Sequence, residues 1–159
     1  MRVAVFTGSF DPITLGHYDI IERGSKIFDK VIVLVMVNPD KKGLFELEER
    51  VELIKKTVSD LYNVEVDAYW GLLVDYMKER NYNIIIKGLR NTNDFNYEYD
   101  MESANKKLYS DVETVFLMSD RNKSFISSSM VKQIAKFGGE LNGCVSKEVE
   151  CAILDKMRL

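Results

Sequence analysis

Residues 31–37 read Val-Ile-Val-Leu-Val-Met-Val, an unbroken apolar run in which most side chains are β-branched. A strand with one face in water alternates apolar and polar side chains, so this run predicts a strand that is buried on both faces. Sheets covered on both faces are mostly parallel, because the helices that connect parallel strands pack on them. The run therefore predicts a parallel sheet enclosed between helices.

Shorter apolar runs alternate with longer amphipathic stretches along the rest of the chain. Further strands are expected at residues 3–7, 64–68, 84–86 and 114–118. Helices are expected at residues 17–28, 47–61, 72–80 and 97–109, and two more, at 127–137 and 146–157, follow the last strand. Strands that alternate with helices form βαβ units. The sequence thus predicts an α/β, Rossmann-like, doubly wound sheet of five parallel strands, with helices on both faces and extra C-terminal helices.

Size and charge narrow the class of protein. The chain has 159 residues, 46% of them hydrophobic, with nine glycines and two prolines, which predicts one domain over residues 1–159 and excludes disordered and collagen-like chains. A net charge of −3 provides no overall positive field, so neither a nucleic acid nor an acidic membrane is an expected partner. Apolar runs stay well below the ~20 residues that cross a bilayer. With Cys144 and Cys151 expected as reduced thiols, we expect a cytoplasmic protein.

The loop after the first expected strand, residues 8–17, reads Gly-Ser-Phe-Asp-Pro-Ile-Thr-Leu-Gly-His. Gly8 permits a tight turn and Gly16 a close approach at the start of the next helix. His17, the only histidine, falls in the first turn of that helix, where free N–H groups and the helix dipole favour a phosphate. The loop has neither the G-x-G-x-x-G nor the Walker A spacing, which disfavours a Rossmann dehydrogenase and a P-loop kinase.

Two further groups of residues suit phosphate binding, beyond the carboxyl ends of strands where doubly wound sheets bind ligands. Lys41 follows the second strand, and Lys87-Gly88-Leu89-Arg90 follows the fourth and brings two cations. Ser127, an expected helix N-cap, is followed by Ser128 and Ser129. Three serines at a helix start offer hydroxyl and backbone N–H groups together, which is a cradle for a polyphosphate.

Other charged stretches are typical of solvated helix faces. The helix expected at 47–61 carries Glu48, Glu49, Arg50, Glu52, Lys55 and Lys56. We interpret these residues as one exposed face in which Glu52 and Lys56 form an i,i+4 pair. By pattern alone, Glu98 also lies on an acidic solvated face and Leu73 is an ordinary apolar residue.

The first loop resembles the Thr-x-Gly-His signature of the nucleotidyltransferase superfamily. Its longer form, with Phe10-Asp11-Pro12, resembles the phosphopantetheine adenylyltransferase family. Later blocks follow that family's order across nearly the whole chain: Asn38-Pro39-Asp40-Lys41-Lys42, Leu47-Glu48-Glu49-Arg50, Lys87-Gly88-Leu89-Arg90, Asp94-Phe95-x-Tyr97-Glu98 and Ser124-Phe125-Ile126-Ser127-Ser128-Ser129. The resemblance implies transfer of adenylyl from ATP to 4′-phosphopantetheine, which gives dephospho-coenzyme A and pyrophosphate by in-line attack without a covalent intermediate.

The resemblance also implies roles for individual residues. His17 would be the catalytic residue at the α-phosphate. Contacts to ATP would come from Ser9, Phe10, His17, Gly88, Leu89, Arg90, Glu98, Lys123, Ser124, Phe125, Ile126, Ser127, Ser128 and Ser129. Contacts to the acceptor would come from Ser9, Lys41, Leu73 and Lys87. The family usually has Arg at position 87 and Trp at position 123, where this chain has lysines.

The resemblance extends to cofactor and assembly. Mg²⁺ is expected with ATP, without a protein metal site, and a homohexamer is expected because family members usually form one. Three alternatives stay open on the sequence. They are a nucleotidyltransferase for another acceptor, such as nicotinamide mononucleotide or glycerol phosphate, a non-catalytic nucleotide-sensing module, and a flavodoxin-like redox protein.

Overall fold

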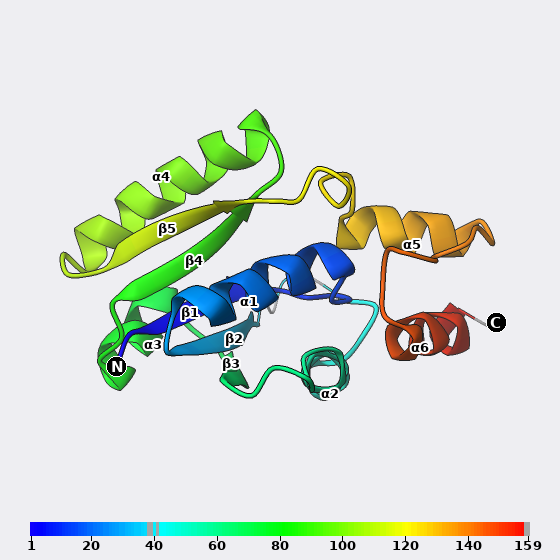
Figure 1. Cartoon of the computed structure of the whole chain (residues 1–159), viewed down its shortest axis with the longest axis horizontal. Coiled ribbons are helices and arrows are strands. Elements are labelled where there is room, and N and C mark those ends of the chain that lie inside the picture. The colour runs from blue at the N-terminus through cyan, green and yellow to red at the C-terminus, as the bar shows by residue number, and fades with distance from the viewer. Residues whose placement is uncertain (38–39, 41, 158–159) are drawn as a thin grey trace.

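Five parallel strands form one sheet in the computed structural model, which describes residues 1–37, 40 and 42–157 (Figure 1). The strands are β1 (Val3–Gly8), β2 (Lys30–Met36), β3 (Val64–Tyr69), β4 (Ile84–Leu89) and β5 (Glu113–Met118). Their order, β3-β2-β1-β4-β5, is the Rossmann-like one and confirms the predicted fold class. A flavodoxin-like sheet has the order 2-1-3-4-5, so that alternative is wrong.

Six helices accompany this sheet in the described part of the chain. They are α1 (Leu15–Ile27), α2 (Leu47–Thr57), α3 (Leu73–Arg80), α4 (Thr92–Leu108), α5 (Ser128–Lys136) and α6 (Lys147–Met157). None of them is long and apolar enough to cross a membrane. Figure 1 shows α5 and α6 beyond one end of the sheet, as the extra C-terminal helices of the prediction.

Strand β2 is buried on both faces, as its apolar run predicts. Val31, Val33 and Val35 belong to a core cluster that also contains residues of α1, α2, α5 and α6. Ile32 and Leu34 point to the opposite face and belong to a second cluster with residues of α3. Successive strand side chains alternate between faces, so one apolar run fills both cores.

Two boundaries differ from the predicted ones in places that matter for the site. Strand β4 continues to Leu89, because residues 87–89 pair with 116–118 of β5, and only Arg90 directly follows the strand. Helix α4 begins at Thr92 rather than residue 97, because the Asn91 side chain accepts the Asp94 amide N–H at 3.0 Å and caps the helix. Asp94 and Glu98 are therefore carried on a helix beside the end of β4.

Candidate active site

A pocket of about 270 Å³ opens at the carboxyl ends of β1 and β4. From β1 the chain builds the sheet toward one edge, through β2 and β3, and from β4 it builds toward the other edge, to β5. The junction of β1 and β4 is therefore the switch point of the fold. Ligands of doubly wound sheets bind at such points. The lining comes from β1 and its following loop, the first turns of α1, the end of β4, the start of α4 and the segment before α5.

Nine of the seventeen expected site residues line this pocket, although they are scattered over the chain. They are Phe10, His17, Lys87, Gly88, Arg90, Glu98, Ile126, Ser127 and Ser128. The remaining described ones do not line it: Ser9, Leu73, Leu89, Lys123, Ser124, Phe125 and Ser129. Lys41 lies outside the described residues.

The imidazole of His17 is fixed by the N-terminal cap of α1. Thr14 donates its backbone N–H to His17 Nδ1 at 3.0 Å, and Thr14 Oγ1 accepts the His17 amide N–H at 3.3 Å. The ring of Phe10 packs edge-on against the imidazole at 5.0 Å between centroids. Because Nδ1 accepts a hydrogen bond, the neutral ring carries its proton on Nε2. That Nε2–H is the donor available to a ligand in the pocket.

Burial of the imidazole and, second, the positive charge of Arg90 lower the pKa of His17 to about 4. At neutral pH the ring is thus uncharged. It meets an anion as a hydrogen-bond donor rather than as a cation.

The single histidine gives a direct test of this pKa. We expect the ¹³C-labelled His17 ring signal to titrate with a midpoint near 4, well below the ordinary value of 6.5. As the pH falls, the unfolded chain takes up this proton first. The contribution of His17 to stability is therefore complete above pH 6.5 and is lost between 6.5 and about 4. A midpoint near 6.5 would contradict a ring that is desolvated and neutral in the folded chain.

Arg90 lines the pocket and is held by Asp94, which lines it too. Its Nε donates to Asp94 Oδ2 at 2.9 Å and its Nη2 to Asp94 Oδ1 at 3.3 Å, which is a bidentate pair. Its Nη1 donates to the backbone carbonyl of Ile126 at 3.3 Å. These three bonds use three of the five guanidinium N–H groups. The planar group is thus oriented and keeps two donors for a phosphate.

The start of α5 uses its serines differently from the predicted hydroxyl cradle. Ser127 Oγ accepts the Met130 amide N–H at 3.1 Å and caps the helix, as predicted. Ser128 donates its hydroxyl to the carbonyl of Pro12 at 2.7 Å, and Ser129 is exposed outside the pocket lining. The first-turn backbone N–H groups of α5, rather than three hydroxyls, are the donors suited to an anion here.

Comparison with known proteins complements this geometry. The Cytidylyltransferase-like family model matches residues 5–134. Phosphopantetheine adenylyltransferase of Clostridium botulinum (strain Eklund 17B / Type B) is 56% identical over 159 residues, which is 100% of both chains. The enzyme of the same name from Clostridium novyi (strain NT) is 55% identical over 157 residues, 99% of this chain and 98% of that one.

The chain belongs to the phosphopantetheine adenylyltransferase family. It is therefore a nucleotidyltransferase, and the resemblance of its sequence blocks is confirmed. A solved structure from Vibrio parahaemolyticus, described as a nicotinate-nucleotide adenylyltransferase, superposes with a TM-score of 0.73 at 16% identity. It covers 100% of this chain and 98% of its own, and this likeness shows the shared fold.

Lys87 and Lys123, at the positions where the resemblance implies Arg and Trp, each have an acidic partner in the structure. Lys87 Nζ lies 3.4 Å from Glu98 Oε2, and their side chains are only 19% and 17% exposed. Lys123 Nζ lies 3.9 Å from Asp19 Oδ1, outside the pocket lining. Lys87 keeps the positive charge of arginine in the pocket but presents it as a point rather than a fork.

Sequence reasoning missed several residues that build the site. Thr14 and Asp94 were not expected there, although Thr14 stands three residues before His17, as in a helix cap, and Asp94 stands four after Arg90. Arg50 was expected on a solvated face, but its Nη1 reaches the backbone carbonyl of Ser9 at 3.0 Å and steadies the first loop.

The expected pairing on helix α2 was also wrong. Glu52 pairs with Lys55 at 3.0 Å, three residues on, rather than with Lys56. Both spacings bring side chains together on a helix, and charge pattern alone does not choose between them.

Proposed function

We propose that the chain transfers the adenylyl group of ATP to 4′-phosphopantetheine, which gives dephospho-coenzyme A and pyrophosphate. The relatives' shared name supplies the acceptor. The observation that supports adenylyl transfer is the meeting of a neutral His17, an oriented Arg90 and the start of α5 in one pocket at the switch point. These groups offer the donors that an ATP triphosphate requires.

We propose an in-line displacement at the α-phosphorus. An oxygen of the acceptor's phosphate forms the new bond, and the bond between the α-phosphorus and the oxygen bridging to the β-phosphate breaks. The acceptor phosphate is already an anion, so the step needs no general base. His17 Nε2–H donates to an α-phosphate oxygen, while Arg90 and the α5 N–H groups hold the leaving pyrophosphate. Catalysis is thus positioning and charge stabilisation.

The remaining expected residues keep their roles as proposals. Lys87, Lys41, Ser9 and Leu73 serve the acceptor, and Glu98 and the segment 123–129 serve ATP. Mg²⁺ enters as part of the ATP substrate. No three His, Cys, Asp or Glu side chains within residues 1–37, 40 and 42–157 form a metal site, so we propose that triphosphate oxygens and water hold the ion.

A pyrophosphate-release assay tests this function. Release is expected only when ATP, Mg²⁺ and 4′-phosphopantetheine are all present. Nicotinamide mononucleotide and glycerol phosphate, offered as acceptors at the same concentration, are the controls and should give no release. Binding of ATP without any release of pyrophosphate on addition of 4′-phosphopantetheine would contradict the proposal and favour a nucleotide-sensing module.

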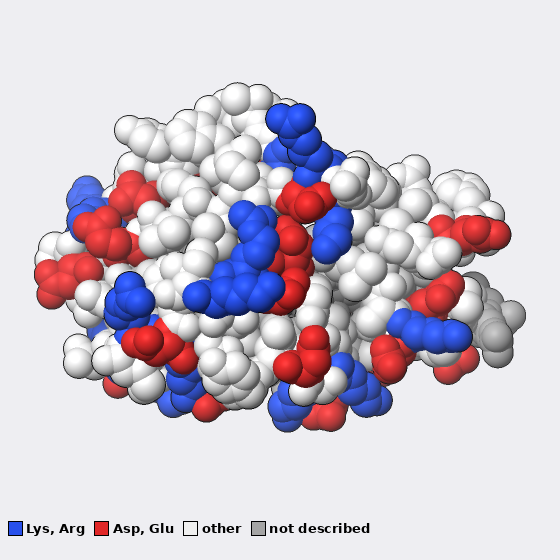
Figure 2. All heavy atoms as spheres, in the orientation of Figure 1, with Lys and Arg blue, Asp and Glu red and all other residues white. Residues whose placement is uncertain are grey.

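We also propose a homohexamer in the cytoplasm, with residues 1–159 acting as one domain. Helix α4 buries only Asn105 and leaves Phe95, Tyr97, Tyr99 and Met101 at least 40% exposed, which suits a contact between copies. Acidic and basic side chains lie among one another on the face shown in Figure 2, so this face offers no continuous positive surface for a nucleic acid.

Light scattering after size exclusion tests the assembly. The wild-type mass is expected at six times the chain mass of 18.3 kDa. Tyr97→Lys combined with Tyr99→Lys places two charges among the exposed apolar side chains of α4 and should lower that mass. Tyr62→Lys, at a side chain that is 98% exposed away from α4, is the matched control. A wild-type monomer would contradict the proposed hexamer.

A further inference from the structure

Two buried carboxylates flank the pocket without lining it. Among the acidic residues that the structure describes, only Asp11 and Asp19 are buried, each 7% exposed. A buried carboxylate is costly unless hydrogen bonds satisfy its oxygens, and removing a partner leaves an uncompensated charge. The partners of each carboxylate therefore show which part of the chain it holds in place.

Asp11 holds the segment that follows the second strand. Its Oδ2 accepts the Leu44 amide N–H at 2.8 Å and its Oδ1 accepts the Phe45 amide N–H at 2.9 Å. Lys132 of α5 adds an ion pair at 3.3 Å. The fit is close, since a Cβ on Gly43 would lie 3.0 Å from Asp11 Oδ2. Leu44 and Phe45 stand three and four residues after Lys41 in the sequence, so Asp11 anchors the chain downstream of that position.

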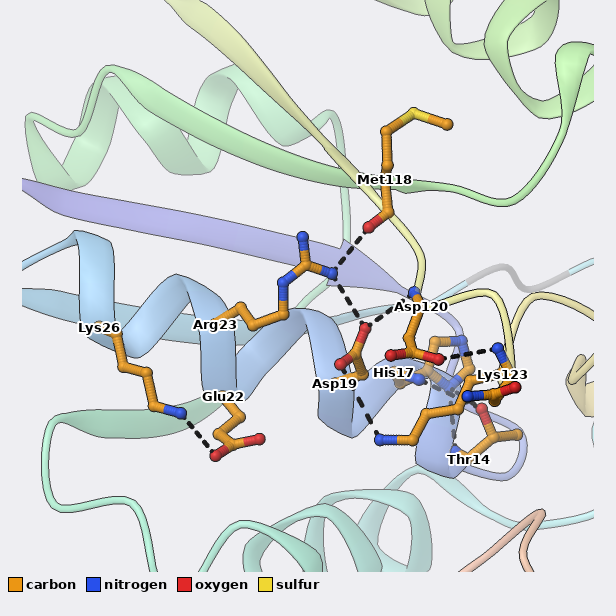
Figure 3. Close-up of polar contacts among 10 residues, drawn as sticks. Thr14, His17, Asp19, Glu22, Arg23, Lys26, Met118, Asp120 and Lys123 are labelled. Carbon is orange, nitrogen blue, oxygen red and sulfur yellow. Dashed lines mark hydrogen bonds and ion pairs between the residues drawn. The ribbon is translucent and has the colours of Figure 1, made fainter.

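Asp19 holds the segment that follows β5 (Figure 3). Its Oδ2 accepts the Asp120 amide N–H at 3.3 Å and a hydrogen bond from Arg23 Nη1 at 3.1 Å. The same Arg23 nitrogen donates to the carbonyl of Met118 at 2.7 Å. Lys123 approaches the other carboxylate oxygen at 3.9 Å. Asp19 thus ties α1, just past His17, to the stretch that leads into the start of α5.

We propose that Asp11 and Asp19 are positioning residues that each serve one substrate. Asp11 fixes residues 44–45, which follow the proposed acceptor residue Lys41 in the sequence, and Asp19 fixes residues 118–120, which lead into the proposed ATP segment 123–129. The proposal rests on the proposed function. Both carboxylates come from the stretch 11–19, which also carries His17. One continuous stretch of the chain therefore positions both segments relative to the imidazole of His17. In-line attack depends on the relative positions of the two substrates, because misplacement of the reacting groups by ~1 Å can cost about 100-fold in rate.

The KM values of both variants for both substrates test which substrate each carboxylate serves. Asparagine keeps the volume of aspartate but replaces one acceptor oxygen with an NH₂ donor, which opposes a backbone N–H. Asp11→Asn is expected to raise KM for 4′-phosphopantetheine by about tenfold, the loss of one charge-assisted hydrogen bond, with KM for ATP unchanged. Asp19→Asn is expected to raise KM for ATP by a similar factor, with KM for the acceptor unchanged. Each variant is the control for the other.

Hydrogen–deuterium exchange of the whole enzyme gives a readout that needs no turnover. Peptides covering residues 43–46 should exchange faster only in Asp11→Asn, and peptides covering 118–123 only in Asp19→Asn. Where a variant fails to fold, two other changes perturb the same contacts and should give the same crossed pattern with smaller factors. Gly43→Ala places a Cβ 3.0 Å from Asp11 Oδ2, and Arg23→Ala removes a hydrogen-bond partner of Asp19. Parallel increases in both Michaelis constants, or exchange that is not segment-specific, would overturn the proposal. Absence of pyrophosphate release by the wild type would instead overturn the proposed function, and the exchange data would still decide what each carboxylate holds.

Discussion

Replacing His17 with alanine is expected to lower kcat for pyrophosphate release by at least ~100-fold, with little change in KM for either substrate. The imidazole is neutral, with its pKa lowered to about 4, and its Nδ1 is occupied by Thr14. In the proposed mechanism its one free donor, Nε2–H, serves the α-phosphate, where charge redistributes in the transition state. Loss of one such oriented donor typically costs ~2.7–4 kcal/mol of barrier. Substrate binding depends on other groups, so KM is spared.

His17→Gln is the informative companion of the alanine variant. A glutamine amide can place an N–H near the position of Nε2, so part of the lost rate should return. Thr14→Ser keeps both the backbone N–H and the hydroxyl that hold the ring, and it should stay near wild-type turnover. Steady-state kinetics with thermal unfolding of all three variants separates a lost donor from a lost fold. Near-normal turnover of His17→Ala would remove His17 from the mechanism.

The fold followed from local patterns for a physical reason. A β-branched apolar run such as residues 31–37 is stable only when both of its faces are covered, so local composition implied the layers of the whole sheet. The order of the strands in the sheet did not follow from local patterns. The same alternation of strands and helices suits both Rossmann-like and flavodoxin-like sheets, and long-range pairing of β1 with β4 separates them.

The site was predictable where backbone and sequence agree, as at His17 in the first turn of α1 and at Ser127 as a helix cap. It was not predictable where a side chain reaches another element. Arg50 contacts the carbonyl of Ser9, 41 residues away, and nothing in a charged helix run indicates which of its side chains turns inward. Ser128 likewise donates its hydroxyl to the carbonyl of Pro12, 116 residues away. Such contacts depend on tertiary packing.

Replacing Arg90 with alanine is expected to lower kcat/KM for ATP by about 100-fold or more. Pyrophosphate gains charge as it leaves, and the guanidinium, already oriented by Asp94 and the Ile126 carbonyl, offers its remaining donors without reorganisation. Arg90→Lys keeps the charge but loses the planar fork, so it should recover only part of the loss. Arg80→Ala removes the same charge from α3 outside the pocket and is the matched control.

The same variant makes a second, independent readout possible, because the charge of Arg90 helps to lower the pKa of His17. Without that charge, the His17 midpoint should rise above about 4, while burial of the ring still keeps it below 6.5. Arg90→Lys should leave the midpoint low. If Arg90→Ala lost activity with an unchanged His17 midpoint, the guanidinium would act on the substrate alone. If activity stayed near normal while the midpoint rose, Arg90 would tune the imidazole without holding pyrophosphate, and its proposed role would be wrong.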